Sequence, residues 1–199
     1  MRTYGFEREY FVKKGDEFVM AEGLPKDACG YLAEARGKAS TNVLDAAFLM
    51  LSDEYELIKI ARKKGLELFT DTPQKLPPQF LREAVRTNGK NIATDYTCSG
   101  KWNDAKWQHA GLHVHFGFET EFTYYSRNSD NPLTRTHLGE IPNIPRYIYL
   151  LDKRFKDIIK TAKRAPGLYE LKPYGFEYRS LPASVPPVEV ADFLKSEGL

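Results

Sequence analysis

Residues 110–118 read AGLHVHFGF, a stretch that decides the fold prediction because polar and apolar side chains alternate along it. His113 and His115 are separated by Val114, and further apolar residues stand on either side of them. Successive side chains of a β-strand point to opposite faces of a sheet, so we expect the two histidines to share one face and the apolar residues the other. The stretch therefore predicts a strand with one core-facing side and one polar side.

Three other stretches repeat this alternation, and each places two charged residues on one face. The pairs, in chain order, are Glu7 with Glu9, Glu34 with Arg36, and Glu177 with Arg179. Their neighbours are mostly apolar, so each segment predicts a strand with an apolar side and a charged side. The first strand departs from the pattern because Arg8 lies on the face that Phe6 and Tyr10 share.

The segments between the strands predict helices. A helix begins near residues 40–42, which are acceptable N-cap residues, and Gly65 is a natural stop for it. Pro145 suits the first turn of a long helix that runs to about Ala165, and a short final helix begins at residues 186–187. Hairpins and short loops favour a mainly antiparallel sheet with helices on one face, which is an α+β architecture.

The remaining expected elements are shorter. Strands are expected at residues 4–12, 17–21, 29–36, 66–69, 92–97, 111–118, 168–172 and 176–181, and a short helix at 78–87. Residues 99–109 are polar and predict a loop. Residues 120–143 contain few apolar anchors and many turn residues, so we expect a mobile loop there.

Composition restricts the class of protein. The chain has 199 residues, of which 42% are hydrophobic and 28% charged, and this suits a single globular domain over residues 1–199. A net charge of +2 is too small to indicate nucleic acid as a partner. No apolar stretch approaches the ~20 residues needed to cross a membrane. Two cysteines and an N-terminus without a signal-peptide pattern favour the cytoplasm.

If the four strands line one concave surface, their charged sides converge. Crowded carboxylates repel one another unless a cation neutralises them, and oxygen-rich clusters with an imidazole suit Mg²⁺ or Mn²⁺ better than zinc. Arginines beside such a cluster favour a bound phosphate. The sequence contains no glycine-rich phosphate-binding loop, so ATP would have to bind on the sheet through metal ions.

Each pair also has an ordinary structural explanation. A single Glu-x-Glu on a half-exposed strand is usually a solvated face, and Glu-x-Arg most often forms a salt bridge within a sheet. A His-x-His pair is structural about as often as it binds a metal. Four such strands in one chain favour a functional site over these structural explanations.

The stretches YGFEREYF, AGLHVHFGF and KPYGFEYRSLPAS occur in this order and resemble the carboxylate–amine ligase superfamily, which includes glutamine synthetase and γ-glutamylcysteine ligase. Within it they are most similar to the phage-type amidoligases, the COOH–NH2 ligase type 2 group. The resemblance implies a curved, mainly antiparallel sheet with helices on its convex face, like the catalytic domain of glutamine synthetase. The concave face would hold ATP and two or three Mg²⁺ or Mn²⁺ ions. ATP would phosphorylate a carboxylate, and an amine would attack the acyl phosphate to form an amide bond.

The resemblance also implies roles for individual residues. The implied metal ligands are Glu7, Glu9, Glu34, His113, Glu177 and Asp27. The residues implied to bind ATP are His115, Arg179, Lys172 and Arg36, with Lys163 or Arg164 as further cations near phosphate. Glu177 and Arg179 would be the catalytic pair, and His115 would lie deeper than His113 or on the phosphates. The substrates would be small-molecule or peptide carboxylates and amines in the cytoplasm of a bacterial or phage-infected cell.

Several of these assignments have alternatives. Asp27 suits a turn cap as well as a metal, and Arg36 could pair with Glu34 instead of a ligand. Lys172 precedes Pro173 and could belong to the plain surface. A metal-dependent hydrolase or another phosphotransferase could use the same acidic face, and a non-catalytic scaffold could carry it unused. Neither the substrates nor the oligomeric state follow from the sequence.

Overall fold

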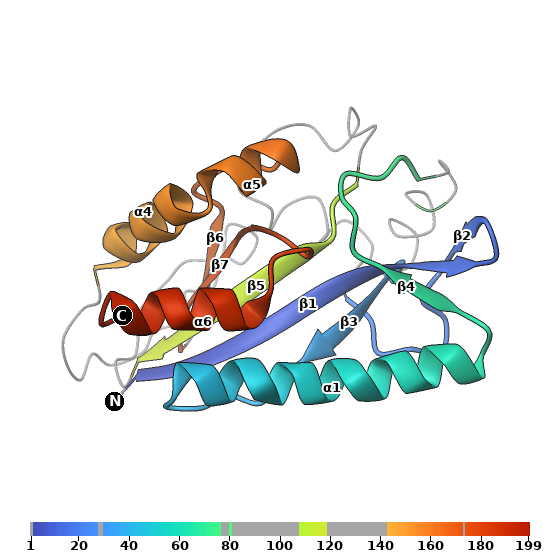
Figure 1. Ribbon diagram of the computed structural model, residues 1–199, viewed down its shortest axis with the longest axis horizontal. Coiled ribbons are helices and arrows are strands. Elements are labelled where there is room, and N and C mark those ends of the chain that lie inside the picture. Colours follow the sequence, from blue (N-terminus) through green and yellow to red (C-terminus); the bar gives the residue numbers. More distant parts are fainter. Residues whose placement is uncertain (1, 28–29, 77–79, 81–107, 119–142, 173) are drawn as a thin grey trace, which may run out of the picture.

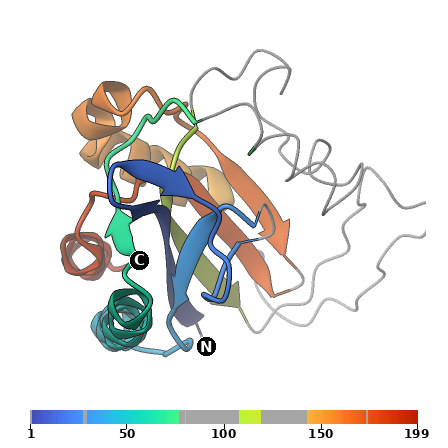
Figure 2. The ribbon, with the colours of Figure 1, turned by 90° about the vertical axis from the view of Figure 1, so that its right-hand side faces the viewer.

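The computed structural model describes residues 2–27, 30–76, 80, 108–118, 143–172 and 174–199. Within these ranges the chain forms one seven-stranded sheet and four helices, so the predicted α+β class is confirmed. All strand pairs in the sheet are antiparallel. The sheet curls into a partial barrel, and the four helices lie on the same side of it (Figures 1 and 2).

The long strand β1 (Arg2–Lys14) organises the sheet. The other strands are β2 (Glu17–Val19), β3 (Leu32–Arg36), β4 (Glu67–Phe69), β5 (Gly111–Phe118), β6 (Tyr169–Lys172) and β7 (Gly175–Pro182). Their order is β2-β1-β5-β7-β6, with β3 and β4 also paired to β1. The expected strands in the described ranges are therefore confirmed, including the hairpin of β1 and β2, whose turn contains Gly15 at a φ of 60°.

The first helix, α1 (Val43–Lys63), begins and ends where the sequence predicts. The side chain of Asn42 accepts hydrogen bonds from the backbone N–H groups of Leu44 and Asp45, which would otherwise have no partner inside the helix. Gly65 follows the helix with a φ of 66°, a conformation that glycine adopts without strain. The apolar side of α1 packs against the sheet.

The expected single helix from Pro145 to about Ala165 is wrong, because two shorter helices occupy this segment. These are α4 (Ile144–Arg154) and α5 (Lys156–Thr161). Phe155 separates them with a φ of −104° and a ψ of 17°, and its ring is buried at 6.0 Å from the ring of Phe193. At this break the ring of Phe155 packs against Phe193 of the last helix, α6 (Pro187–Ser196).

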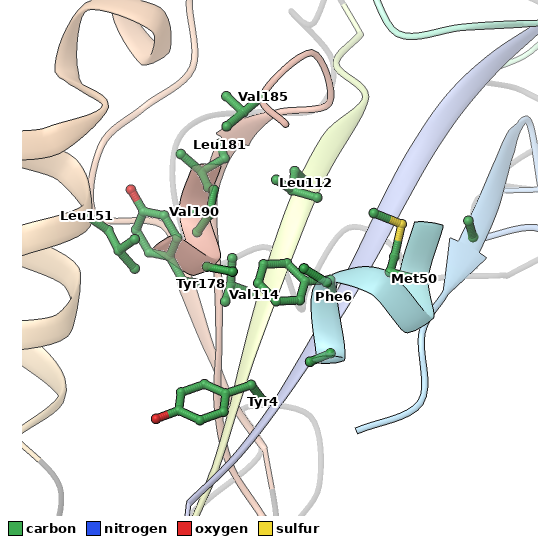
Figure 3. Close-up of a cluster of buried hydrophobic side chains, with 14 of the residues drawn as sticks. Tyr4, Phe6, Met50, Leu112, Val114, Leu151, Tyr178, Leu181, Val185 and Val190 are labelled. Carbon is green, nitrogen blue, oxygen red and sulfur yellow. The ribbon is translucent and has the colours of Figure 1, made fainter. Parts of the chain in front are cut away.

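The main apolar core fills the space between the sheet and the helices (Figure 3). Strands and helices each contribute fully buried side chains to it, among them Phe6, Val114, Tyr178, Met50, Leu151 and Val190. Burying a side chain of this size stabilises the fold by ~2 kcal/mol relative to leaving it in water. Because this core occupies the helix side of the sheet, the charged sides of the strands point away from the helices.

A smaller apolar cluster lies on the other face of the sheet. Phe11 of β1 pairs with Leu32 of β3, and both side chains are buried. Leu76 and Phe80 belong to the same cluster. Since Phe11 lies two residues beyond Glu9 on β1, this cluster adjoins one end of the charged face and excludes water there.

Several predictions lie outside the described residues. They are the strand at 92–97, nearly all of the helix at 78–87, most of the loop at 99–109, and residues 120–142 of the expected mobile loop. The same holds for Cys29, Cys98, Trp102, Trp107 and His137. Among the helices of the described ranges, none has the length and apolarity needed to span a membrane.

Candidate metal centre

Strand pairing brings charged residues from four strands onto the face opposite the helices. On β1, Glu7 pairs with His113 of β5 and with Arg36 of β3. His115 of β5 pairs with Glu177 of β7. Residues opposite each other on paired strands point to the same face, so these side chains meet. We call Glu7, Glu34, His113, His115 and Glu177 the acid–histidine cluster.

Two sets of three residues in this cluster have the geometry to hold a metal ion. One set is Glu7, His115 and Glu177, and the other is Glu7, Glu34 and His113. In each set the three donor atoms lie within 4.8 Å of one another. Glu7 belongs to both sets, so its carboxylate could bridge two ions. All five residues are among the site residues predicted from the sequence, His115 as a residue on the ATP phosphates and the other four as metal ligands.

The ring nitrogens of the two histidines support a cation site. His113 Nδ1 lies 3.0 Å from Glu177 Oε1, and His115 Nε2 lies 3.3 Å from Glu7 Oε2. Both nitrogens are buried, yet neither makes a hydrogen bond to any residue that the structure describes. Each nitrogen thus faces a carboxylate at ion-pair distance without a well-directed hydrogen bond, and a divalent cation bound by the same groups would give both atoms a partner. Three carboxylates with two imidazoles suit Mg²⁺ or Mn²⁺.

The electrostatics of the cluster reflect three carboxylates in a largely buried place. Burial alone would raise the pKa of Glu7 and of Glu177, but the facing histidines outweigh it and hold both values well below the usual range. Burial raises the pKa of Glu34 to about 8, and the nearby charge of Glu7 adds to this shift. Burial and Arg179 oppose protonation of His113, but neighbouring carboxylates raise its pKa to about 9. The acid–histidine cluster therefore strongly favours a positive charge, whether on a protonated histidine or on a bound cation.

Cationic side chains flank the cluster on its β6–β7 side. Lys172 Nζ lies 2.9 Å from carboxylate oxygens of both Glu177 and Glu170. Arg179 Nη1 donates to Glu177 Oε1 at 2.6 Å and to Glu170 Oε2 at 3.2 Å. Lys172 therefore belongs to the site and not to the plain surface. Two cations beside a metal-capable cluster form a place that suits phosphate oxygens.

A third cation, Arg36, flanks the cluster on the β3 side. Its guanidinium lies 2.5 Å from Glu34 and 3.5 Å from Glu7. The pairing with Glu34 considered from the sequence is thus present. With 60% of its side chain exposed, Arg36 can also turn toward a ligand. The cluster therefore has positive charge on two opposite sides.

Two residues expected as metal ligands lie outside both metal-capable sets. Glu9 is buried, accepts a hydrogen bond from the Gly111 N–H at 2.7 Å, and lies 3.8 Å from His113 Nε2. Asp27 accepts a hydrogen bond from the Gly30 N–H at 3.0 Å, which is the turn-capping role weighed as its alternative. Glu9 thus holds the strand beside the cluster, and Asp27 closes a turn.

Of the two places expected for His115, the deeper one is wrong, whereas a place on the phosphates stays a prediction. The side chain of His113 is 3% exposed, whereas that of His115 is 15% exposed. The difference arises because His113 lies opposite Glu7 and beside Glu9, near the apolar end of this face, whereas His115 lies opposite Gly5, which has no side chain to cover it. His115 is therefore the more accessible of the two imidazoles.

Two residues near the cluster, Glu170 and Tyr174, extend the site beyond its predicted members, and Arg164 supports it from behind. Glu170 joins Lys172 and Arg179, and the Glu-x-Lys alternation of residues 170–172 could have identified it. Tyr174 Oη lies 2.6 Å from His115 Nδ1, a contact that no sequence pattern indicates. Arg164, considered as a cation near phosphate, donates from Nε to the Ser180 carbonyl at 3.0 Å and from its Nη2 to the Arg179 carbonyl, so it supports the backbone that carries Arg179.

A hollow of about 380 Å³ adjoins the cluster at the end opposite the small apolar cluster. Glu7, His115 and Tyr174 form part of its wall, and Gly5, Gly37 and Gly117 lie along it. A Cβ atom on Gly117 would lie 2.2 Å from Thr3 Oγ1, so the glycine permits Thr3 to pack there. The glycines carry no side chains, so backbone forms part of the wall beside the candidate metal ligands.

This arrangement can hold one or two divalent cations, place phosphate oxygens near Lys172 and Arg179, and accept a further group in the hollow. Comparisons with family models, with curated proteins and with solved structures find no match to the chain.

Proposed function

We propose that this protein is an ATP-dependent carboxylate–amine ligase with a glutamine synthetase-like catalytic domain. The observation that carries the proposal is the pair of metal-capable sets that share Glu7, with Lys172 and Arg179 directly beside them. A simple hydrolytic metal site does not need two cations next to its ligands, whereas a site for a polyphosphate does.

In this proposal the acid–histidine cluster binds two Mg²⁺ ions, one in each of its two sets. Bound Mg²⁺ would draw negative charge from the phosphate oxygens of ATP and hold the chain of phosphates in place. Glu7 would contact both ions, because it belongs to both sets. Glu9 would act indirectly, by holding the Gly111 backbone where β5 enters the site.

Lys172 and Arg179 would bind the phosphate oxygens. Both now contact Glu177 and Glu170, and binding of the phosphates would draw their positive charges toward the new anion. Arg179 is the better candidate for the transferred phosphoryl group, since its planar guanidinium can donate two parallel hydrogen bonds to it. The hollow beside His115 would receive the base of the nucleotide, because its glycines leave backbone that a ring can approach closely.

The reaction would proceed in two steps, transfer of a phosphoryl group and attack by an amine. A carboxylate oxygen of the substrate attacks the terminal phosphorus of ATP, the bond to ADP breaks, and an acyl phosphate forms. An amine then attacks the acyl carbon, inorganic phosphate leaves, and the nitrogen loses a proton. Arg179 and Lys172 stabilise the negative charge of both leaving groups.

The test combines the full chain with Mg-ATP, hydroxylamine as the amine, and a mixture of amino acids and dicarboxylic acids. We expect ADP and hydroxamate products in equal amounts. Glu177→Gln and His113→Gln should each lower the rate at least ~100-fold, since each removes a member of a metal-capable set. Glu189→Gln is the matched control, because this exposed glutamate pairs with Arg154 away from the site.

Three other outcomes of this experiment would each indicate a different function. Cleavage of a substrate without nucleotide would indicate a metal-dependent hydrolase on the same acidic face. ADP with a phosphorylated product and no hydroxamate would indicate another phosphotransferase. No reaction and no thermal shift with Mg-ATP would indicate a scaffold without catalysis.

A further inference from the structure

The outer side of helix α1 carries much of the apolar surface that the described part of the chain exposes. Phe48 is 57% exposed, Tyr55 62%, Leu49 40% and Ile60 37%. Isolated apolar residues are ordinary on a protein surface, but these four gather on one helix of 21 residues. The helix lies at the outer edge of the molecule in two perpendicular views, with its apolar core side on the sheet (Figures 1 and 2). Its exposed side is therefore accessible to a second protein surface.

The exposed residues of α1 include a continuous row with the spacing of a coiled-coil seam. The row advances by three and four residues in turn, so its members follow one line along the helix. It consists of Asp45, Phe48, Ser52, Tyr55, Lys59 and Arg62, all of which are exposed. We call these six residues the α1 seam. Side chains at this spacing can pack between those of a second helix.

The two ends of the α1 seam carry opposite charges. Asp45 lies in the first turn of the helix and Arg62 in the last. In an antiparallel pair of two α1 helices, one register matches all six seam positions. It places Asp45, Phe48 and Ser52 opposite the partner's Arg62, the partner's Lys59 and the partner's Tyr55. A parallel pair would instead place like charges together at both ends, so the charges favour the antiparallel arrangement.

The inner layers of this register also join side chains that attract or fit one another. A lysine over the face of a phenylalanine ring forms a cation–π contact, and Lys59 Nζ already lies 5.3 Å from the Tyr55 ring centroid in its own helix. The ion pair of Lys59 with Glu56, at 2.9 Å, is exposed and opens at little cost. The short side chain of Ser52 leaves room for the ring of Tyr55. The α1 seam is thus complementary to itself in every layer.

We propose that α1 is the interface of a homodimer, in which it packs antiparallel against α1 of a second copy across a two-fold axis near the middle of the helix. Both copies contribute the same six residues, so each layer occurs twice. One helix pair makes a small interface, which gives a Kd of roughly micromolar size. The interface lies on the helix side of the sheet, away from the acid–histidine cluster, and does not depend on the proposed function.

Sedimentation velocity of the full chain at low salt, over a series from about 1 to 200 µM, tests the dimer. We expect a transition from monomer to dimer within this series. Phe48→Ser should raise the dimer Kd about tenfold, because it removes an aromatic ring from two layers. Phe48 is exposed, so the variant should keep its fold. Tyr149→Ser is the matched control, since it removes an aromatic ring of α4 that is 62% exposed, and it should leave the Kd unchanged.

Charge reversal tests the antiparallel register. Asp45→Arg and Arg62→Asp each place like charges together in both outer layers, so each variant alone should dimerise at least ~tenfold more weakly than the wild type. An equimolar mixture of the two should recover the dimer, because the arginines of one chain then face the aspartates of the other. Glu189→Arg and Lys195→Asp are controls that reverse exposed charges in the first and last turns of α6, and neither should change the Kd. Circular dichroism checks that all variants fold.

Three results would overturn the proposal. A wild-type chain that stays monomeric throughout the series does so without recourse to any variant. A dimer that Phe48→Ser and both charge reversals leave unchanged forms through another surface. A dimer that both reversals weaken but their mixture does not recover excludes the antiparallel register.

Discussion

Arg8 shows how one residue can break a sequence pattern for a structural reason. It lies on the helix side of β1, where apolar side chains predominate, and is 9% exposed. Its guanidinium pairs with Glu54 of α1 at 3.1 Å and donates to the Val185 carbonyl at 2.6 Å. A buried ion pair of this kind is costly to break from one side, because the remaining charge has no partner. Arg8 thus connects β1 to α1 and to the segment before α6.

The buried imidazole of His109 should make the stability of the fold depend on pH. Burial and the nearby charge of Arg164 lower the pKa of His109 to about 4, and its Nδ1 lies 3.2 Å from Thr72 Oγ1. The unfolded chain binds a proton near pH 6.5 and the folded chain does so near pH 4. The free energy of unfolding should therefore fall as pH decreases through this window.

Urea denaturation of the wild type and of His109→Asn at pH 7 and pH 5 measures the effect. The loss of stability between these values should be about 1 kcal/mol larger in the wild type, after allowance for the partial exposure of the ring. Carboxylates titrate equally in both proteins, so the difference isolates His109. Equal losses in the two proteins would show that His109 is not kept neutral by the fold.

Helix α1 provides a prediction at the scale of an element. Asn42→Ala removes the side chain that accepts from Leu44 and Asp45, so the free energy of unfolding should fall by about 1 kcal/mol. Ser52→Ala is the matched control, since it replaces an exposed residue within the same helix and should change stability little or raise it. A loss of equal size in both variants, measured in urea, would contradict the capping role.

Helix α1 also contacts β3, a strand that carries part of the candidate metal site. Asp53 accepts a hydrogen bond from the Arg36 N–H at 2.9 Å, at the end of β3. β3 carries both Glu34 and Arg36, so α1 fixes the edge strand that completes one of the metal-capable sets. The sequence predicts both elements but not this contact, because a backbone N–H and a carboxylate 17 residues apart meet only after β3 and α1 pack together.

The pairing of β5 with β7 illustrates an irregularity that alternation does not predict. The register shifts between Leu112 and Val114, so Arg179 and Ser180 together lie opposite His113. Simple alternation would place Leu181 on the charged face with Arg179, but Leu181 is fully buried in the main core. The shift is what allows Arg179 to face the site while Leu181 joins the core.

At the scale of the whole molecule, cation binding should stabilise the fold. Mn²⁺ at 100 times its Kd would add about 2.7 kcal/mol to the free energy of unfolding, which corresponds to a rise in Tm of roughly 5–10 °C for a chain of this length. Glu7→Gln should abolish most of this rise, since Glu7 belongs to both metal-capable sets. Differential scanning fluorimetry measures the shift.

The control for this experiment is Glu189→Gln, whose glutamate lies on α6 and pairs with Arg154. It should show the full Mn²⁺ shift. A Glu7→Gln protein that gains as much as the wild type would place the cation elsewhere in the molecule. Glu7→Gln alone is expected to fold, because this position is partly exposed and glutamine has nearly the same volume.

The strands, the capped helix α1 and the members of the acid–histidine cluster can all be read from the order of the amino acids. These depend on local rules, because a period of two residues assigns each side chain of a strand to a face wherever the strand lies. Four features follow instead from packing in three dimensions: which charged faces meet, the greater depth of His113 than of His115, the contact of Glu9 with backbone, and the contact of Tyr174 with His115. Those outcomes depend on register, bulges and the break at Phe155, which are set by packing between residues far apart in the chain.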